Sequence, residues 1–80
     1  MRLKERGLYR LRDGREFIAC ATGDGRGYFL YTPEEWNRSG LADYRVDASG
    51  RIFNKGRLTH WRVEDLKEIV QSGINYRPAG

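Results

Sequence analysis

Short apolar runs separated by glycine-containing turns are the feature of this sequence that most restricts its fold. Asp13-Gly14 lies between the runs 9–11 and 17–21, and the glycine-rich segment 23–27 separates the second run from residues 28–31. An Asp-Gly pair flanked by alternating apolar residues is the strongest short-range signal of a β-hairpin. Residues 1–31 are therefore predicted to form a three-stranded antiparallel meander.

Glycine-containing turns also separate short runs in the second half of the chain. Gly50 and Gly56 each follow small or polar residues, which predicts turns at 48–50 and 54–56. These turns separate short strands near 44–47, 51–53 and 57–60. The pattern is typical of a sheet built from consecutive hairpins.

Two helices are expected besides the strands. Thr32-Pro33-Glu34-Glu35 has the residues of a capping box with proline at the first helical position, and Ser39-Gly40 follows, so a short helix is predicted near 33–38. Val63, Leu66, Ile69 and Val70 recur at helical spacing before Gly73. This recurrence predicts a longer C-terminal helix near 62–72.

Taken together, these elements predict an α+β chain that is mostly β. The expected architecture is a small SH3-like barrel, or a curved antiparallel sheet of 5–6 short strands, with the two helices. Residues 1–80 are expected to form a single small domain, with 1–5 and 75–80 as disordered tails.

Composition points to a cytoplasmic location and away from a membrane. No apolar run approaches the length of about 20 residues that a bilayer-spanning helix needs. Cys20 is the sole cysteine, which excludes an internal disulfide and a cysteine-rich metal site. The net charge of +4 has two interpretations. Arginine-rich surfaces bind phosphates and carboxylates, but a charge of this size is also what solubility alone requires.

The sequence does not predict an enzyme or a cofactor. His60 is the sole histidine and lies far along the chain from Cys20, so a nucleophilic pair would require the fold to bring them together. No histidines, cysteines or carboxylates recur at metal-ligand spacing. The pairs Glu34-Glu35 and Glu64-Asp65 each fall in the first turn of a predicted helix, where capping and the helix dipole explain them.

A two-residue turn at Asp13-Gly14 would place Tyr9 opposite Ile18, and a loop over 23–27 would place Cys20 opposite Leu30. Because side chains alternate between the faces of a sheet, one face would then be apolar and the other would mix arginines with aromatics. A one-residue bulge in either turn would exchange the faces. The candidate ligand-binding residues on the mixed face are Arg10, Arg12, Arg15, Phe17, Phe29 and Tyr31.

The expected function is that of a small non-catalytic binding module. One hypothesis is a protein-interaction domain of the adaptor or inhibitor kind, because aromatic residues with arginine mark interaction hot spots. The alternative is a domain that binds DNA or RNA with this arginine and aromatic face. Self-association through an uncovered sheet face is a further possibility. If a helix covers the mixed face, its aromatic residues belong to the core and not to a site.

Overall fold

The computed structural model describes residues 3–38 and 40–69, and the bounds of its elements follow the predicted turns. In chain order the elements are β1 (Leu8–Arg10), β2 (Glu16–Ala21), β3 (Tyr28–Tyr31), α1 (Pro33–Asn37), β4 (Tyr44–Val46), β5 (Arg51–Asn54), β6 (Arg57–Arg62), a 3-10 turn (Val63–Asp65) and β7 (Lys67–Glu68).

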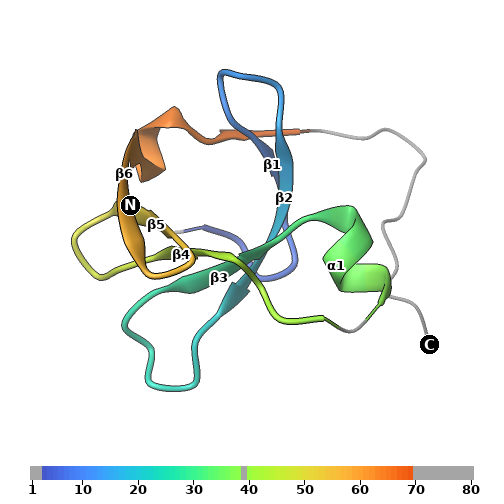
Figure 1. Ribbon diagram of the computed structural model, residues 1–80, viewed down its shortest axis with the longest axis horizontal. Coiled ribbons are helices and arrows are strands. Elements are labelled where there is room, and N and C mark those ends of the chain that lie inside the picture. The colour runs from blue at the N-terminus through green and yellow to red at the C-terminus, as the bar shows by residue number, and fades with distance from the viewer. Residues whose placement is uncertain (1–2, 39, 70–80) are drawn as a thin grey trace.

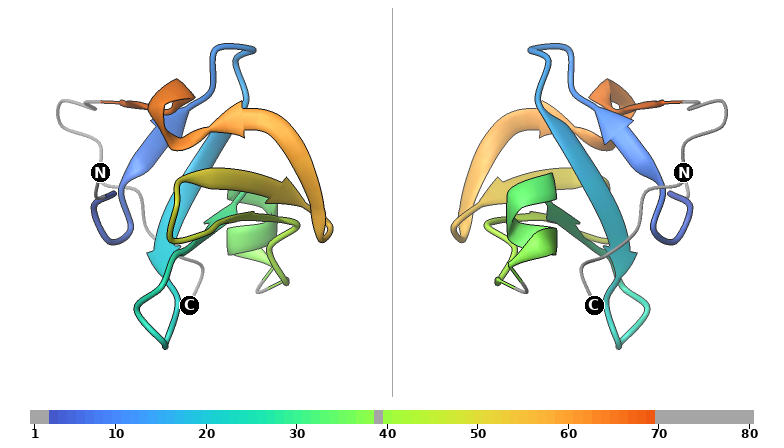
Figure 2. Two further views of the ribbon diagram at one scale, coloured as in Figure 1. Left: turned by 90° about the vertical axis from the view of Figure 1, so that its left-hand side faces the viewer. Right: turned by 90° about the vertical axis from the view of Figure 1, so that its right-hand side faces the viewer.

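The strands form one antiparallel sheet in the order β6-β5-β4-β3-β2-β1-β7, curled into a half-barrel (Figures 1 and 2). This confirms a mostly-β α+β chain with a curved antiparallel sheet. The expected number of 5–6 strands was wrong, since the described residues form seven. No helix in ranges 3–38 and 40–69 is long and apolar enough to cross a membrane.

The loop of the first hairpin begins one residue earlier than predicted and is one residue longer. Gly14 has a φ of +97°, and the N–H of Leu11 donates to the carbonyl of Arg15 at 2.8 Å. This is a three-residue loop that ends in a left-handed glycine, not a two-residue loop. Tyr9 consequently pairs with Phe17, and the predicted pairing of Tyr9 with Ile18 was wrong.

The second hairpin is also displaced by one residue. Its loop is shorter than predicted, because the N–H of Thr22 donates to the carbonyl of Gly27 at 3.0 Å. Leu30 therefore pairs with Ala19 and not with Cys20. A shift of one residue moves a side chain to the opposite face of the sheet. Phe17 and Ala19 thus face the core, while Cys20 lies on the outer face.

The core fills the concave side of the half-barrel. Phe17, Leu30 and Ile52 are fully buried there, and the rings of Phe17 and Tyr44 lie 4.8 Å apart. Leu3 also belongs to this core, and Glu5 accepts a hydrogen bond from the N–H of Ala21 at 2.7 Å. Both residues lie in the segment 1–5 that was expected as a tail, whereas 75–80 lies outside the described residues.

The short helix predicted near 33–38 is confirmed as α1. Thr32 caps it as predicted, because its hydroxyl accepts from the N–H of Glu35 at 3.1 Å while the Glu35 carboxylate accepts from the N–H of Thr32 at 2.9 Å. The ring of Trp36 meets that of Tyr31 edge-on at 5.3 Å. This contact holds α1 against one end of the outer face (Figure 1).

The helix predicted near 62–72 was wrong. Val63–Asp65 form a single 3-10 turn, Leu66 is extended, and β7 then pairs with β1. The three-residue spacing of Val63 and Leu66 fits a 3-10 turn as well as it fits an α-helix, and both side chains are buried in the core. The part of the prediction that covers 70–72 lies outside the described residues.

Candidate binding surface on the outer face

The structure separates the residues that the sequence grouped into one site. Phe17 is buried in the core, whereas Phe29 and Tyr31 lie on the outer face with their rings 6.3 Å apart. Of the three predicted aromatic residues, the fold therefore brings together two.

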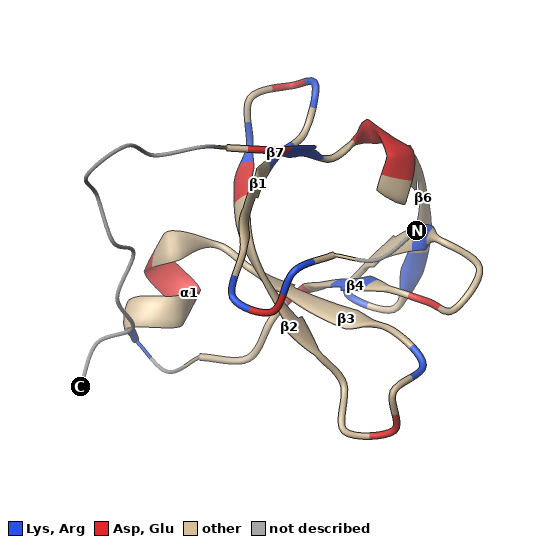
Figure 3. Cartoon of the chain, turned by 180° about the vertical axis from the view of Figure 1, so that it is seen from behind, with Lys and Arg blue, Asp and Glu red and all other residues tan. Residues whose placement is uncertain are grey.

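The three predicted arginines form ion pairs within the chain. Arg10 pairs with Glu16 at 2.8 Å, and Arg12 with Asp65 at 3.2 Å. Figure 3 shows the tip of the β1–β2 hairpin near the acidic 3-10 turn that carries Asp65. Arg15 pairs with Asp13 at 3.1 Å and also donates a hydrogen bond to the Tyr44 hydroxyl. Each of the three is thus paired with a carboxylate, and Arg10 and Arg12 line one hollow beside β7.

A different set of residues forms a continuous row across the outer face. Successive cross-strand pairs link Cys20 to Phe29, Phe29 to Arg45, Arg45 to Phe53, and Phe53 to Leu58. We call these five residues the outer row. It crosses β2, β3, β4, β5 and β6, which at about 4.8 Å between strands gives a length of roughly 19 Å.

The outer row exposes apolar surface at two points. Phe29 retains 37% of its accessible surface and Leu58 retains 59%. Between them the guanidinium of Arg45 lies over the Phe53 ring, 5.5 Å from its centre. This contact is a cation–π interaction that holds an exposed positive charge in the middle of an apolar surface.

The row has a different boundary at each end. At the β2 end the Cys20 thiol donates to the Glu5 carboxylate at 3.2 Å. Burial, followed by this hydrogen bond, raises the pKa of Cys20, so the thiol is a poor nucleophile. At the β6 end the sheet finishes within the described residues, and His60 stacks on Trp61 with ring centres 4.4 Å apart. Three strands separate Cys20 from His60, so the fold does not form the nucleophilic pair.

β5, β6 and the turn between them are basic. Residues 51–62 include Arg51, Lys55, Arg57 and Arg62 and contain no aspartate or glutamate. Arg51 is paired with Asp47 of the preceding turn at 3.0 Å. Lys55 and Arg57 lie in the β5–β6 turn and at the start of β6, beside the Leu58 end of the outer row, whereas Arg62 is the last residue of β6.

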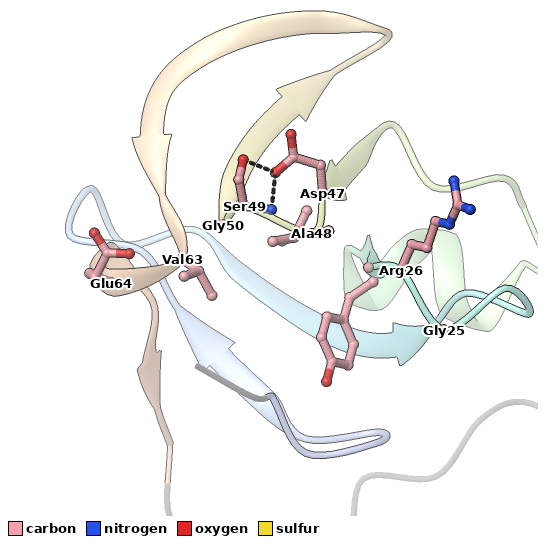
Figure 4. Close-up of a pocket in the computed structure, with 11 residues that line it drawn as sticks. Gly25, Arg26, Asp47, Ala48, Ser49, Gly50, Val63 and Glu64 are labelled. Carbon is pink, nitrogen blue, oxygen red and sulfur yellow. Dashed lines mark hydrogen bonds between the residues drawn. The ribbon is translucent and has the colours of Figure 1, made fainter.

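A hollow of about 290 Å³ lies between the β2–β3 loop, the β4–β5 loop and the 3-10 turn (Figure 4). Its aspartate, Asp47, already accepts hydrogen bonds from the N–H and the hydroxyl of Ser49 at 3.0 and 2.9 Å. The N–H of Arg51 donates to the same oxygen at 2.9 Å, and together these bonds hold the pKa of Asp47 at about 2. The carboxylate therefore stabilises a turn and is not poised for acid–base chemistry.

Sequence reasoning missed Arg45, Phe53 and Leu58. The acid-free stretch 51–62 was a visible signal, as was the alternation of Arg51 and Phe53 with the apolar Ile52. What could not be read from the sequence was that these residues share a face with Phe29, because this depends on the register of every hairpin between them.

Comparison with known proteins adds no functional information. No protein-family model, no curated protein and no solved structure matches this chain.

Proposed function

We propose that this protein is a non-catalytic protein-interaction module that binds its partner with the outer row. The observation that carries the proposal is the row itself, in which exposed Phe29 and Leu58 flank Phe53 and Arg45 across adjacent strands. Aromatic residues and arginine are enriched among the residues that contribute most to protein–protein binding.

The geometry of the row favours a protein ligand over a nucleic acid. Leu58 has no aromatic face on which a base could stack, and one face of the Phe53 ring carries the Arg45 guanidinium. The arginines that would have bound phosphates, Arg10, Arg12 and Arg15, are each paired with a carboxylate.

Nucleic-acid binding is the second candidate, and a specific observation favours it. The acid-free stretch 51–62 contains Phe53 and Leu58 of the outer row and concentrates positive charge around them. Neutralisation of phosphates by such a surface would make DNA or RNA binding strongly dependent on salt.

Two further features belong to the proposal. We place the module among SH3-like barrels, because the last strand of its described residues pairs with the first. This likeness concerns architecture and says nothing about the ligand. We place the protein in the cytoplasm, where a lone reduced cysteine such as Cys20 is ordinary.

The test is retention of a partner by the tagged protein from a nuclease-treated extract of the native host. The wild type should retain a protein after nuclease treatment, and the double variant Phe29→Ala/Leu58→Ala should lose it. The matched control is Leu41→Ala, because Leu41 is 90% exposed but lies outside the outer row. Equal retention by the double variant contradicts the proposal, and retention abolished by nuclease replaces it with the second candidate.

A further inference from the structure

We propose that the partner of the outer row contributes an extended acidic segment, which pairs with β6 as an additional strand of the sheet. This inference rests on the proposed function and specifies how the partner binds. It follows from three features of β6: its position in the sheet, the direction of its backbone groups, and the charge around it.

The first feature is position. β6 ends the sheet within the described residues, since it pairs with β5 on one side and stands last in the strand order. An edge strand presents a row of N–H and C=O groups to which an extended peptide can add, with main-chain hydrogen bonds supplying much of the affinity.

The second feature is the direction of the Leu58 backbone. Lys55 and Gly56 have φ values of +51° and +81°, which define a two-residue turn flanked by the pair Asn54 and Arg57. In such a hairpin the flanking pair exchanges hydrogen bonds, and the next pair along does not. Leu58 belongs to that next pair, so its N–H and C=O point away from β5 toward the open edge.

A bulge limits the length of this open edge. The register changes between Arg51 and Phe53, and beyond Leu58 the hydroxyl of Thr59 donates to the carbonyl of Ile52 at 2.7 Å. The same hydroxyl accepts from the N–H of Trp61 at 3.1 Å. The docking position is therefore short and centred on Leu58, which also ends the outer row. An added strand would extend that row by one residue.

The third feature is charge, which selects the occupant. Lys55, Arg57 and Arg62 lie along β6 and its turn, in a stretch that contains no acidic residue. A second copy of the chain is disfavoured there, since it would bring a second basic and acid-free β6 beside the first. Like charges directly opposite across a strand pair are destabilising, whereas opposite charges stabilise it. An extended segment with acidic residues at its ends fits this edge.

The test uses a synthetic peptide in which valine and threonine alternate between terminal glutamates, with a lysine-ended version as its control. Titration of the labelled protein, followed by backbone amide resonances, should show that the glutamate peptide shifts Leu58 and slows its amide exchange with solvent. The lysine-ended peptide should do neither. Arg57→Glu should weaken binding of the glutamate peptide about tenfold and strengthen binding of the control.

Two substitutions at one position separate strand addition from side-chain contact. Leu58→Ala and Leu58→Pro both remove the leucine side chain, but only the proline removes the backbone N–H that points to the open edge. An edge position tolerates proline, so thermal unfolding of the two variants should be similar. Leu58→Pro should bind the glutamate peptide about tenfold more weakly than Leu58→Ala, as expected for one lost hydrogen bond of about 1.4 kcal/mol.

Equal binding by the two Leu58 variants overturns strand addition. An unchanged Leu58 amide resonance on titration with the glutamate peptide overturns it as well. This measurement uses the wild-type protein and does not depend on the folding of a variant. Neither result bears on the proposal that the outer row binds a protein. That proposal is tested separately, by partner retention in the variant Phe29→Ala/Leu58→Ala. If single-stranded DNA shifts the Leu58 amide resonance and the glutamate peptide does not, the occupant of this edge is a nucleic acid and the proposal of an acidic segment is overturned.

Discussion

Gly27 shows how closely individual residues are fitted in this sheet. A Cβ atom at this position would lie 2.0 Å from the carbonyl oxygen of Val46, which is backbone and cannot rotate away. Gly27→Ala should therefore destabilise the protein by about 1–3 kcal/mol in urea unfolding. Gly23→Ala is the matched control, because a Cβ there meets nothing within 4 Å. Equal stability of the two variants would show that Gly27 and the Val46 backbone do not approach each other this closely.

The ionisation of Asp47 makes the stability of the folded protein depend on pH in acid. Hydrogen bonds from the N–H of Arg51 and from Ser49 lower its pKa from 3.8 to about 2. A carboxyl whose pKa is lower in the folded state stabilises the fold above its unfolded pKa, and this contribution is lost as pH falls through the folded value. The urea midpoint of the wild type should fall between pH 4 and pH 2. Asp47→Asn should be less stable at neutral pH and lose less over that interval, and parallel curves would contradict this role.

At the scale of elements, the turn of the β5–β6 hairpin holds one residue, Lys55, in a strained backbone conformation. Lys55 has a φ of +51°, a left-handed conformation that costs a residue other than glycine, asparagine or aspartate roughly 1–2 kcal/mol. Lys55→Asn should stabilise the protein by up to about 1 kcal/mol in urea unfolding, since asparagine before Gly56 suits this turn. Lys55→Ala removes the same charge without this preference and should give no gain. An equal gain from both variants would assign the effect to charge.

Elements were predictable from the sequence where their signals are local. The capping residues of α1 lie within four positions of one another, and Gly14, Gly50 and Gly56 each mark a turn that the structure contains. Register was not predictable, because a loop closed by Gly14 can hold two residues or three and the sequence fits both. The third residue of this loop shifted the pairing by one position and thereby moved Phe17 from the predicted site into the core. The prediction of a C-terminal helix failed for a related reason. The pairing of β7 with β1 is a long-range contact, which a local pattern does not reveal.

At the scale of the whole molecule, the curl of the sheet divides the aromatic residues between two roles. Phe17, Tyr9 and Tyr44 fill the concave side, whereas Phe29 and Phe53 lie on the outside beside Arg45. The helix α1 covers the outer face at Tyr31, next to Phe29 rather than over it. The concave face is therefore core, and the binding role of the outer face is our proposal.

The most direct test of this division is urea unfolding of Phe17→Ala and Phe29→Ala side by side. Phe17 is fully buried, so its loss should cost about 3–5 kcal/mol through lost burial and a cavity. Phe29 is 37% exposed and serves binding in this account, so its loss should cost less than about 1 kcal/mol. Equal losses would contradict the account, because they would show that the outer row is covered and belongs to the core.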